Sequence, residues 1–172
     1  GDYVIAEVDH FTKFAVFAVE KKEELAPSFS DTVGHPEEAN IRRARTIGLV
    51  NGYPDGTFGP DQEITREQFV MMLMNLLKPE GDGAPLSFAD KDEIAGFAQK
   101  AVAQAVQLGI ITGYPNGRFD PEAKINRTQM AIMVAKAMRL EVSAQTSTGF
   151  DDDADIPAWA KGFVVAGISA SS

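Results

Sequence analysis

An 18-residue pattern occurs twice in the chain, and this repetition constrains the fold more than any other feature. "GYPDGTFGPDQEITREQF" fills residues 52–69 and "GYPNGRFDPEAKINRTQM" fills residues 113–130. The matching aromatic, Pro, Ile and Arg positions are separated by a constant 61 residues, without gaps. A fixed period with matching apolar, Gly and Pro positions indicates a repeat architecture.

Each repeat is predicted to form a helix, a Gly/Pro loop and a second helix. The repeats open with an aromatic residue and an aspartate, as "FSD" at 29, "FAD" at 88 and "FDD" at 150. Apolar residues at helical spacing then lead to Gly48 and Gly109, which fit helix C-terminal caps. The residues expected to face the core are Ile41, Ala44, Val102 and Ala105 in the first helices, and Phe69, Met72, Leu73, Leu76, Met130, Met133, Val134 and Ala137 in the second.

The repeats divide the sequence into segments. The N-terminal residues 3–19 are rich in β-branched and aromatic residues, which favours two short strands. We therefore predict a mainly α fold of helix–loop–helix repeats with a short β segment at its N-terminus. The predicted segments are 1–19 (β segment, the tail of a preceding domain), 20–28 (linker), 29–79 (repeat one), 86–142 (repeat two) and 149–172 (repeat three, which stops before its loop and second helix).

Composition excludes several classes of protein. The 172 residues are 44% hydrophobic, enough for a core. A net charge of −9 argues against nucleic-acid binding, because such proteins present a basic face. The absence of cysteine excludes disulfides and thiolate metal sites. No apolar run approaches the roughly 20 residues of a membrane span, and without an initiator Met or a signal peptide we expect the sequence to be a fragment of a larger protein.

An arginine is expected at the first position of each second helix. Thr65 with Gln68 three residues later forms the pattern of a capping box, and this places Arg66 immediately after the N-cap. Cations are disfavoured at a helix start, because the helix dipole is positive there. The corresponding residues of the second repeat are Asn126, Arg127 and Gln129.

Two interpretations of these arginines remain open. Arg66 and Arg127, together with the free N–H groups of the helix start, could hold an anion that is not part of the protein. Alternatively, each arginine could form an ion pair with a carboxylate of a neighbouring repeat. The recurrence of an otherwise unfavourable residue favours the anion.

The acidic and aromatic residues of the repeat openings are further candidates. An aspartate follows the aromatic residue and precedes a helix in each repeat, at Asp31, Asp90 and Asp151. A carboxylate in this position could accept hydrogen bonds from sugar hydroxyls, but more commonly it caps the helix. Trp159 could stack on a sugar or fill an interface. The sequence predicts neither a metal or cofactor site nor a catalytic site, because "FDDDADIP" lacks calcium-loop spacing, the two histidines are isolated, and no nucleophile motif occurs.

The motifs "FSD…GLVNGYPDGTFGPDQEITREQF", "FAD…GIITGYPNGRFDPEAKINRTQM" and "GFDD…IPAWAK" together resemble the S-layer homology (SLH) repeat of bacterial surface proteins. The resemblance covers about residues 29–172. It implies a pseudo-threefold helical array outside the cell, in the cell wall or S-layer. This array would anchor its parent protein non-covalently to a secondary cell-wall polysaccharide, often one carrying pyruvate ketals. Such a ketal would be the anion for the arginines.

The sequence departs from the SLH pattern at several positions. Pro36 and Phe97 stand where the family has Trp, so among the three repeats Trp159 alone keeps that residue. The family's "TRAE" is "TREQ" at 65–68 and "NRTQ" at 126–129. We therefore expect the best ligand site between repeats two and three, at Arg127, Asp151 and Trp159. The expected function is a carbohydrate-binding anchor without enzymatic activity, and the alternative is a self-assembly module that binds no glycan.

Overall fold

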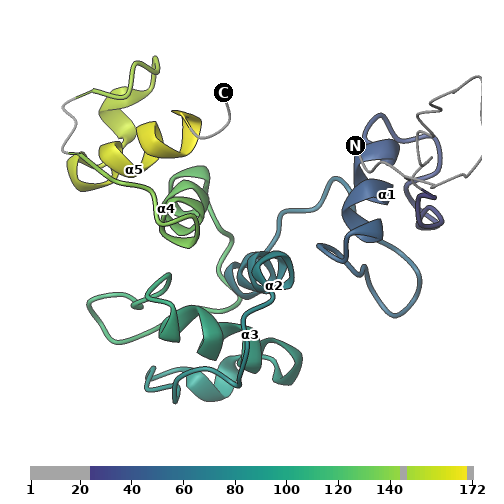
Figure 1. Cartoon of the computed structure of the whole chain (residues 1–172), viewed down its shortest axis with the longest axis horizontal. Coiled ribbons are helices and arrows are strands. Elements are labelled where there is room, and N and C mark those ends of the chain that lie inside the picture. The colour runs from purple at the N-terminus through teal and green to yellow at the C-terminus, as the bar shows by residue number, and fades with distance from the viewer. Residues whose placement is uncertain (1–23, 144–146, 170–172) are drawn as a thin grey trace, which may run out of the picture.

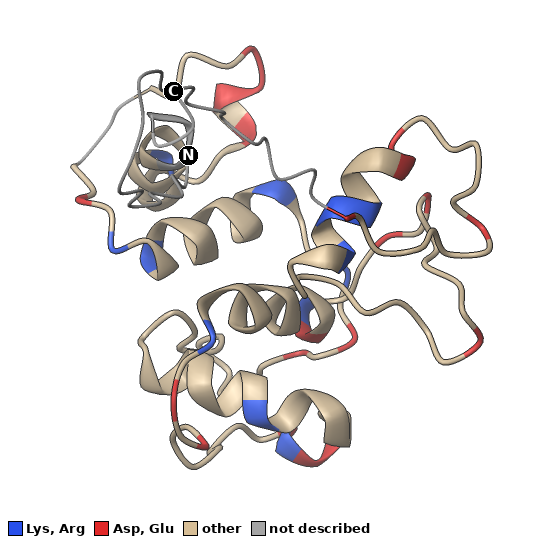
Figure 2. Ribbon diagram, turned by 45° about the vertical axis from the view of Figure 1, so that its right-hand side comes forward, with Lys and Arg blue, Asp and Glu red and all other residues tan. Residues whose placement is uncertain are grey.

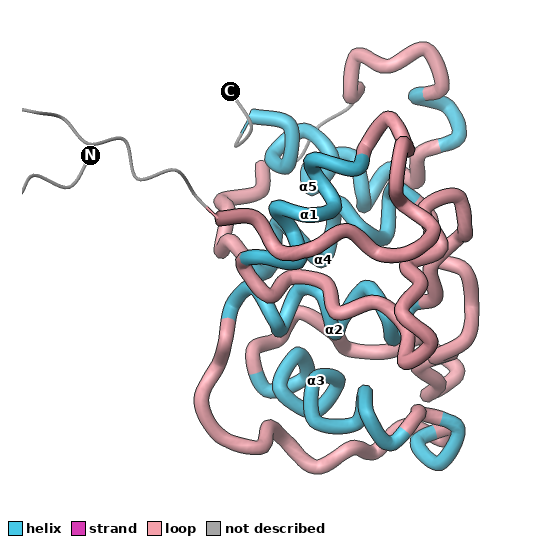
Figure 3. Tube along the Cα trace, turned by 90° about the vertical axis from the view of Figure 1, so that its right-hand side faces the viewer, coloured by secondary structure: helices cyan, strands magenta, loops and turns pink. Residues whose placement is uncertain are grey.

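The protein is mainly helical. The computed structural model describes residues 24–143 and 147–169, and these contain five α-helices, two short 3₁₀ helices and no strand (Figure 3). This confirms the predicted mainly α fold. The pseudo-threefold arrangement stays a prediction, and the predicted β segment at 1–19 lies outside the described residues. The helices are α1 (Glu38–Thr46), α2 (Arg66–Leu77), η1 (Lys91–Glu93), α3 (Gly96–Gln107), α4 (Arg127–Ala137), η2 (Asp153–Asp155) and α5 (Ala158–Ser169).

Glycine ends the first helix of repeats one and two, as predicted. Gly48 and Gly109 follow α1 and α3 with φ of 75° and 71°, a left-handed conformation that glycine adopts without strain. The next residue in each case donates its N–H back into the last turn, from Leu49 to Ala44 O and from Ile110 to Ala105 O, both at 2.9 Å. The backbone therefore turns from each helix into its Gly/Pro loop at the same point of the repeat.

Helix packing is staggered relative to the sequence repeats. The second helix of repeat one, α2, packs against α3 of repeat two, and α4 packs in the same way against α5 of repeat three (Figure 1). The Gly/Pro loop between α1 and α2 (47–65) is called loop one, and that between α3 and α4 (108–126) is called loop two. The largest core cluster lies along the α2–α3 contact and includes residues of loop two and α4. The repeats therefore share a core. The cluster contains Val70, Leu73, Met74, Phe88, Ile94, Ala98, Val102, Ala105, Ile110, Ile111, Phe119 and Met133.

Helix α1 belongs to a second, smaller cluster. Its buried members are Phe29, Ile41 and Val50, and Met72 of α2 packs against them. The backbone of α1 does not come close to any of the other described helices. The first repeat is therefore joined to the main core through its loop and α2 rather than through α1.

The predicted core stripe of α2 is partly wrong. Leu73 is buried, but the fully buried neighbours in α2 are Val70 and Met74, while Leu76 is 55% exposed. The reason is the position of α2 between α3 and α4 (Figure 1), with Met72 directed to the α1 cluster. A helix with neighbours on several sides buries more than one face, so a single-stripe pattern does not describe it.

Stacked phenylalanine pairs fix each Gly/Pro loop to the opening of its own repeat. Phe29 stacks on Phe58 with ring centroids 5.3 Å apart, and Phe88 stacks on Phe119 at 5.5 Å. Gly113 has φ of 76°, and a Cβ built on it would lie 2.7 Å from the Phe88 ring. The glycine therefore provides both the turn and the space for the aromatic side chain.

Candidate functional site

Both predicted capping boxes are present at the starts of α2 and α4. Thr65 Oγ1 accepts the N–H of Gln68 at 3.3 Å, and Gln68 Oε1 accepts the N–H of Thr65 at 2.9 Å. Asn126 and Gln129 make the same reciprocal pair at 2.9 and 3.2 Å. Arg66 and Arg127 are the first residues of their helices, as predicted.

The capping glutamines also hold the tyrosines of the loops. Gln68 donates from Nε2 to the Tyr53 hydroxyl at 3.3 Å, and Gln129 donates to the Tyr114 hydroxyl at 2.8 Å. The amide thus accepts from the N-cap N–H and donates to the tyrosine hydroxyl at once. Glutamine takes this role in a position where the resembled family carries glutamate. Sequence analysis did not find this contact.

The start of α2 docks on loop two, and this forms a seam between repeats one and two. The N–H of Arg66 donates to Ala123 O at 2.9 Å, and the N–H of Glu67 donates to Pro121 O at 3.0 Å. Ile125 donates to Ile64 O beside them, next to an antiparallel bridge. The backbone donors of this helix start are therefore already used. They are not open to an outside anion, and only the Arg66 side chain is left for that role.

The Arg66 guanidinium is buried in this seam without a hydrogen-bonding partner. The residue is 7% exposed, and its Cζ lies 4.7 Å from the Tyr114 ring centroid and 5.3 Å from that of Phe119. Its Nε is buried with no hydrogen bond, and no ion pair to a carboxylate is found within the described residues. Burial lowers the pKa of Arg66 and outweighs Tyr114 and the Asp120 carboxylate, which act in the opposite direction. Among the described residues Arg66 therefore forms no direct ion pair with a carboxylate of the neighbouring repeat, and Asp120 acts on its charge only at longer range.

Arg127 has a different environment. It is exposed at the start of α4, and no hydrogen bond or ion pair of its side chain is found in the part of the protein that the structure describes. No hydrogen bond, ion pair or ring contact joins Arg127 to Asp151 or Trp159 among the described residues, so the predicted seam of these three residues stays a prediction.

Asp31 and Asp90 clamp the loops of their own repeats. Asp31 accepts the N–H groups of Phe58 and Gly59 at 2.8 and 2.7 Å, and Asp90 accepts those of Phe119 and Asp120, both at 2.8 Å. Asp90 makes no side-chain capping bond, so the expected capping role is wrong there. The two loop donors and Arg118 outweigh burial and lower the pKa of Asp90, whose side chain is fully buried. Asp90 therefore positions Phe119 beneath Arg66, and its carboxylate is not open to a sugar.

Asp151 is one residue out of register with these two aspartates. Asp152, not Asp151, precedes η2 as Asp90 precedes η1, and Asp151 itself is exposed. Asp153, which follows Asp152, accepts hydrogen bonds from the N–H and hydroxyl of Thr148 at 2.6 and 2.7 Å and pairs with Lys161. The contact with Lys161, together with the bonds from Thr148, lowers the pKa of Asp153 to about 2. The acidic run is thus used to fix the entry to α5.

Trp159 and Phe97 occupy equivalent places. Each is the second residue of its helix, α5 or α3, and each is largely exposed, at 70% for Trp159 and 68% for Phe97. Of the two open interpretations of Trp159, burial in an interface does not apply within the described residues. Both rings are accessible aromatic surfaces.

Three polar contacts that sequence analysis missed support the Arg66 seam. Glu67 is buried, and its Oε2 accepts the N–H of Ala95 at 3.1 Å, which joins the starts of α2 and α3. Arg118 pairs with Asp120 at 2.8 Å and Glu93 at 3.0 Å, and thereby holds loop two. Ala95 lies 28 residues from Glu67, and Glu93 lies 25 residues from Arg118. Asp120 is close in sequence to Arg118 but has a left-handed backbone, with φ of 54°. No local sequence pattern therefore indicated these contacts.

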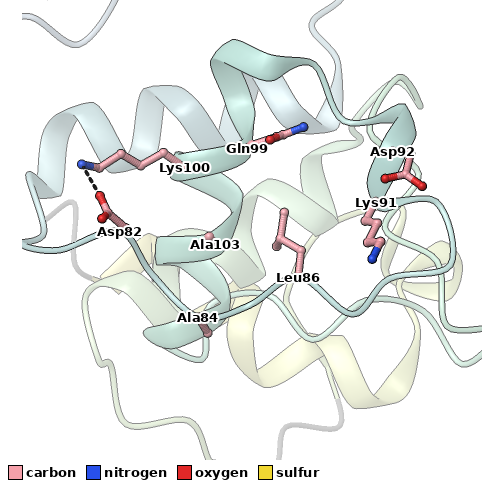
Figure 4. Close-up of a pocket in the computed structure, with 8 residues that line it drawn as sticks. All are labelled: Asp82, Ala84, Leu86, Lys91, Asp92, Gln99, Lys100 and Ala103. Atoms are coloured by element: carbon pink, nitrogen blue, oxygen red, sulfur yellow. Dashed lines mark ion pairs between the residues drawn. The ribbon is translucent and has the colours of Figure 1, made fainter.

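Charge and surface shape offer no stronger site in the described residues. Acidic residues lie mainly in the loops, and α2 to α5 carry few charges, whereas α1 carries Glu38 and three arginines (Figure 2). An open hollow beside α3 is lined by Asp82, Lys91, Asp92 and Lys100, but Lys100 is already paired with Asp82 at 3.0 Å (Figure 4). No cluster that could hold a metal ion occurs in residues 24–143 and 147–169. None of the described helices is both long and apolar enough to cross a membrane.

Comparison with known families identifies the class of protein. The model of the S-layer homology domain matches residues 28–70 and 87–131, about half of the sequence. The chain therefore belongs to the SLH family and is a repeat module of cell-surface and S-layer proteins. Both matched segments include a loop, its tyrosine and the arginine that follows.

Several surface proteins are similar to this chain. The S-layer protein EA1 of Bacillus anthracis is 33% identical over 129 residues, which is 73% of this chain and 15% of that protein. The cellulosome-anchoring protein of Acetivibrio thermocellus is 36% identical over 57% of this chain and 23% of its own length. Cell surface glycoprotein 1 of the same organism is 35% identical over 57% of this chain and 5% of its length. The chain therefore spans less than a quarter of each relative.

Proposed function

We propose that this protein anchors its parent surface protein non-covalently to the bacterial cell wall by binding an anionic, pyruvylated secondary cell-wall polysaccharide. Membership of the SLH family implies a place at the cell wall. The name of one relative describes an anchoring protein, and this agrees with the proposal. We further propose a binding module without catalytic activity, whose complete form is a pseudo-threefold array of repeats.

One observation carries the choice of an anionic ligand, namely the unpaired Arg66 guanidinium. A buried cation without a counter-ion is unfavourable, and a buried donor without an acceptor adds to the cost. Arg66 shows both features in part, since Asp120 acts on its charge only at longer range without a direct ion pair, and its Nε has no acceptor. A carboxylate from a pyruvate ketal would remove both, and its charge-assisted bonds to a guanidinium are among the stronger hydrogen bonds.

The aromatic neighbours leave the arginine able to bind such a group. Arg66 lies over the rings of Tyr114 and Phe119, at 4.7 and 5.3 Å from their centroids. Its N–H groups lie in the plane of the guanidinium, so stacking on a ring face leaves them directed to the side. Asp90 fixes the Phe119 backbone and Gln129 fixes the Tyr114 hydroxyl, so the platform is held rigidly. Phe97, in the first turn of the adjoining helix α3, offers an aromatic face to a sugar ring.

Substitution of Arg66 by methionine tests the proposal. Methionine keeps most of the apolar stem in the seam but removes the charge, so we expect the free protein to remain folded with an unchanged or raised melting temperature. Its affinity for the pyruvylated polymer should fall by roughly 1.5–3 kcal/mol, the range for a hydrogen bond to a charged group. Calorimetry with intact polymer and with acid-depyruvylated polymer measures this loss. Arg66→Lys should recover only part of it.

Arg43→Met is the matched control, because Arg43 is exposed on α1 and its side chain has no contact that the described residues reveal. It should bind as the wild-type does. A folded Arg66→Met protein with wild-type affinity would disprove the assignment of Arg66. Loss of binding in Arg127→Ala instead would move the anion to the start of α4. Equal binding of depyruvylated polymer would disprove the ketal as the ligand, and binding of neither polymer would favour the self-assembly alternative.

A further inference from the structure

We propose that Asn51 is a site of spontaneous deamidation in the folded protein, and that this modification loosens the first repeat. Asn–Gly pairs are the sequences most prone to this reaction, because glycine has no side chain to shield its backbone nitrogen. The two Asn–Gly pairs of the sequence are Asn51–Gly52 and Asn116–Gly117. Both asparagines are exposed, but their local hydrogen bonding differs.

The Asn116 pair is protected by its turn. The N–H of Gly117 donates to Tyr114 O at 2.9 Å, and the side-chain oxygen of Asn116 accepts the N–H of Arg118 at 3.0 Å. The attacking nitrogen must lose its proton, and the carbonyl carbon of the asparagine amide must approach that nitrogen. Both hydrogen bonds oppose these steps, since each holds one of the reacting groups in another arrangement.

The Asn51 pair has neither restraint. The N–H of Gly52 makes no hydrogen bond, and the Asn51 amide makes none, in the portion of the protein that is described. At the corresponding position of repeat two the residue before Gly113 is Thr112, which cannot undergo the reaction. Asn51 is therefore an exposed and unrestrained amide that the second repeat lacks.

The reaction uses only water as a co-reactant. The nitrogen of Gly52 attacks the amide carbon Cγ of Asn51 and forms a five-membered succinimide, while the bond from Cγ to Nδ2 breaks. The amide nitrogen leaves as ammonia and carries away the proton released by Gly52. Water then opens the ring at one of its two carbonyls and gives either aspartate or isoaspartate, so the protein gains one negative charge.

Isoaspartate at this position would disturb a closely packed point. It inserts one extra carbon into the backbone between Val50, which is buried in the α1 cluster, and Gly52. A Cβ built on Gly52, the next residue, would lie 2.3 Å from the Phe29 ring and 2.7 Å from Thr57 O, so Gly52 is closely surrounded on that side. The stacked Phe29–Phe58 pair and the fixing of loop one would be lost.

Peptide mapping by mass spectrometry of the folded protein, aged at mildly alkaline pH, tests this proposal. Asn51 should deamidate roughly two- to tenfold faster than Asn116, the factor expected from one backbone hydrogen bond. In urea-unfolded protein the two rates should become similar. Aged wild-type protein should melt at a lower temperature than aged Asn51→Thr, which takes its residue from Thr112.

Three results would overturn the proposal. The first is deamidation of Asn116 as fast as that of Asn51 in the folded protein. The second is the same difference between the two sites after unfolding, because neighbouring sequence and not hydrogen bonding would then explain it. The third is aged wild-type protein with converted Asn51 but an unchanged melting temperature, which would contradict the structural consequence.

Discussion

At the scale of single residues, the aspartate that opens each of the first two repeats determines the shape of the loop. Asp31 and Asp90 each accept two consecutive N–H groups from a loop that lies almost 30 residues further along the sequence. They differ in burial, since the Asp90 side chain is fully buried whereas Asp31 is exposed. The same pair of contacts should therefore contribute differently to stability in the two repeats.

Removal of the Asp90 carboxylate should destabilise the protein. In Asp90→Ala the N–H of Phe119 loses its acceptor within the core, and Arg118 loses one of its partners. We expect the free energy of unfolding, measured in urea, to fall by about 1.5–3 kcal/mol. Asp31→Ala is the matched variant and should cost less, because water can replace the exposed carboxylate.

The pH dependence of this loss provides a check. The pKa of Asp90 is lowered in the folded state, so its contribution is complete above the pKa of the unfolded state, about 3.9. It is lost as the pH falls through the lower folded value. The difference between wild-type and Asp90→Ala should therefore shrink only in strong acid. A difference that disappears already near neutral pH would contradict this assignment.

At the scale of elements, α2 and α4 begin with the same capping box but in different surroundings. The first N–H groups of α2 have acceptors in loop two, at Ala123 O and Pro121 O. In the described structure no acceptor is found for the corresponding groups of Arg127 and Thr128. The cap is therefore the main restraint on the start of α4.

Asn126→Ala should fray the first turn of α4, while Thr65→Ala should leave the first turn of α2 in place. Both substitutions remove a side-chain acceptor and should lower stability by about 0.5–2 kcal/mol. Amide hydrogen exchange distinguishes them, since exchange should accelerate at residues 127–129 in the first variant and much less at 66–68 in the second. Asn126→Gly, expected to cost only a few tenths of a kcal/mol, is the control. Equal fraying of both helices would refute the role of loop two.

Sequence analysis succeeded where the determining interactions are local. The helices, both capping boxes, the terminal glycines and the position of Arg66 all depend on residues within a few positions of one another. It failed where partners are distant. The stacking of Arg66 on Tyr114 and Phe119, the contact of Glu67 with Ala95 and the exposure of Leu76 follow from how repeats pack, which a periodic pattern does not specify.

At the scale of the whole molecule, the described residues form two hydrophobic clusters of very different size, and these should give different regions different local stability. The large cluster joins α2, α3, loop two and part of α4, whereas the cluster of α1 has three buried residues. Because local stability follows the amount of buried apolar contact, α1 should open more readily than the α2–α3 pair.

Native-state hydrogen exchange should therefore show two rates of protection. Amides of α2 and α3 should exchange slowly and together, near the rate of global unfolding, although they belong to different sequence repeats. Amides of α1 should exchange faster, through a separate opening. Val102→Ala, in the large cluster, should accelerate exchange in both α2 and α3. Exchange that instead groups α1 with α2 would show that the cooperative unit is the sequence repeat.

The stagger between packing and sequence also determines where related genes can recombine without damage. A crossover in the connector at 80–85 would separate α2 from α3 and bring together two halves of unrelated cores. A crossover at residues 60–63 would leave loop one with Phe29 and keep α2 with both α3 and loop two. The unit that can be inherited intact therefore runs from one loop to the next, and its borders lie inside the repeats that the sequence displays.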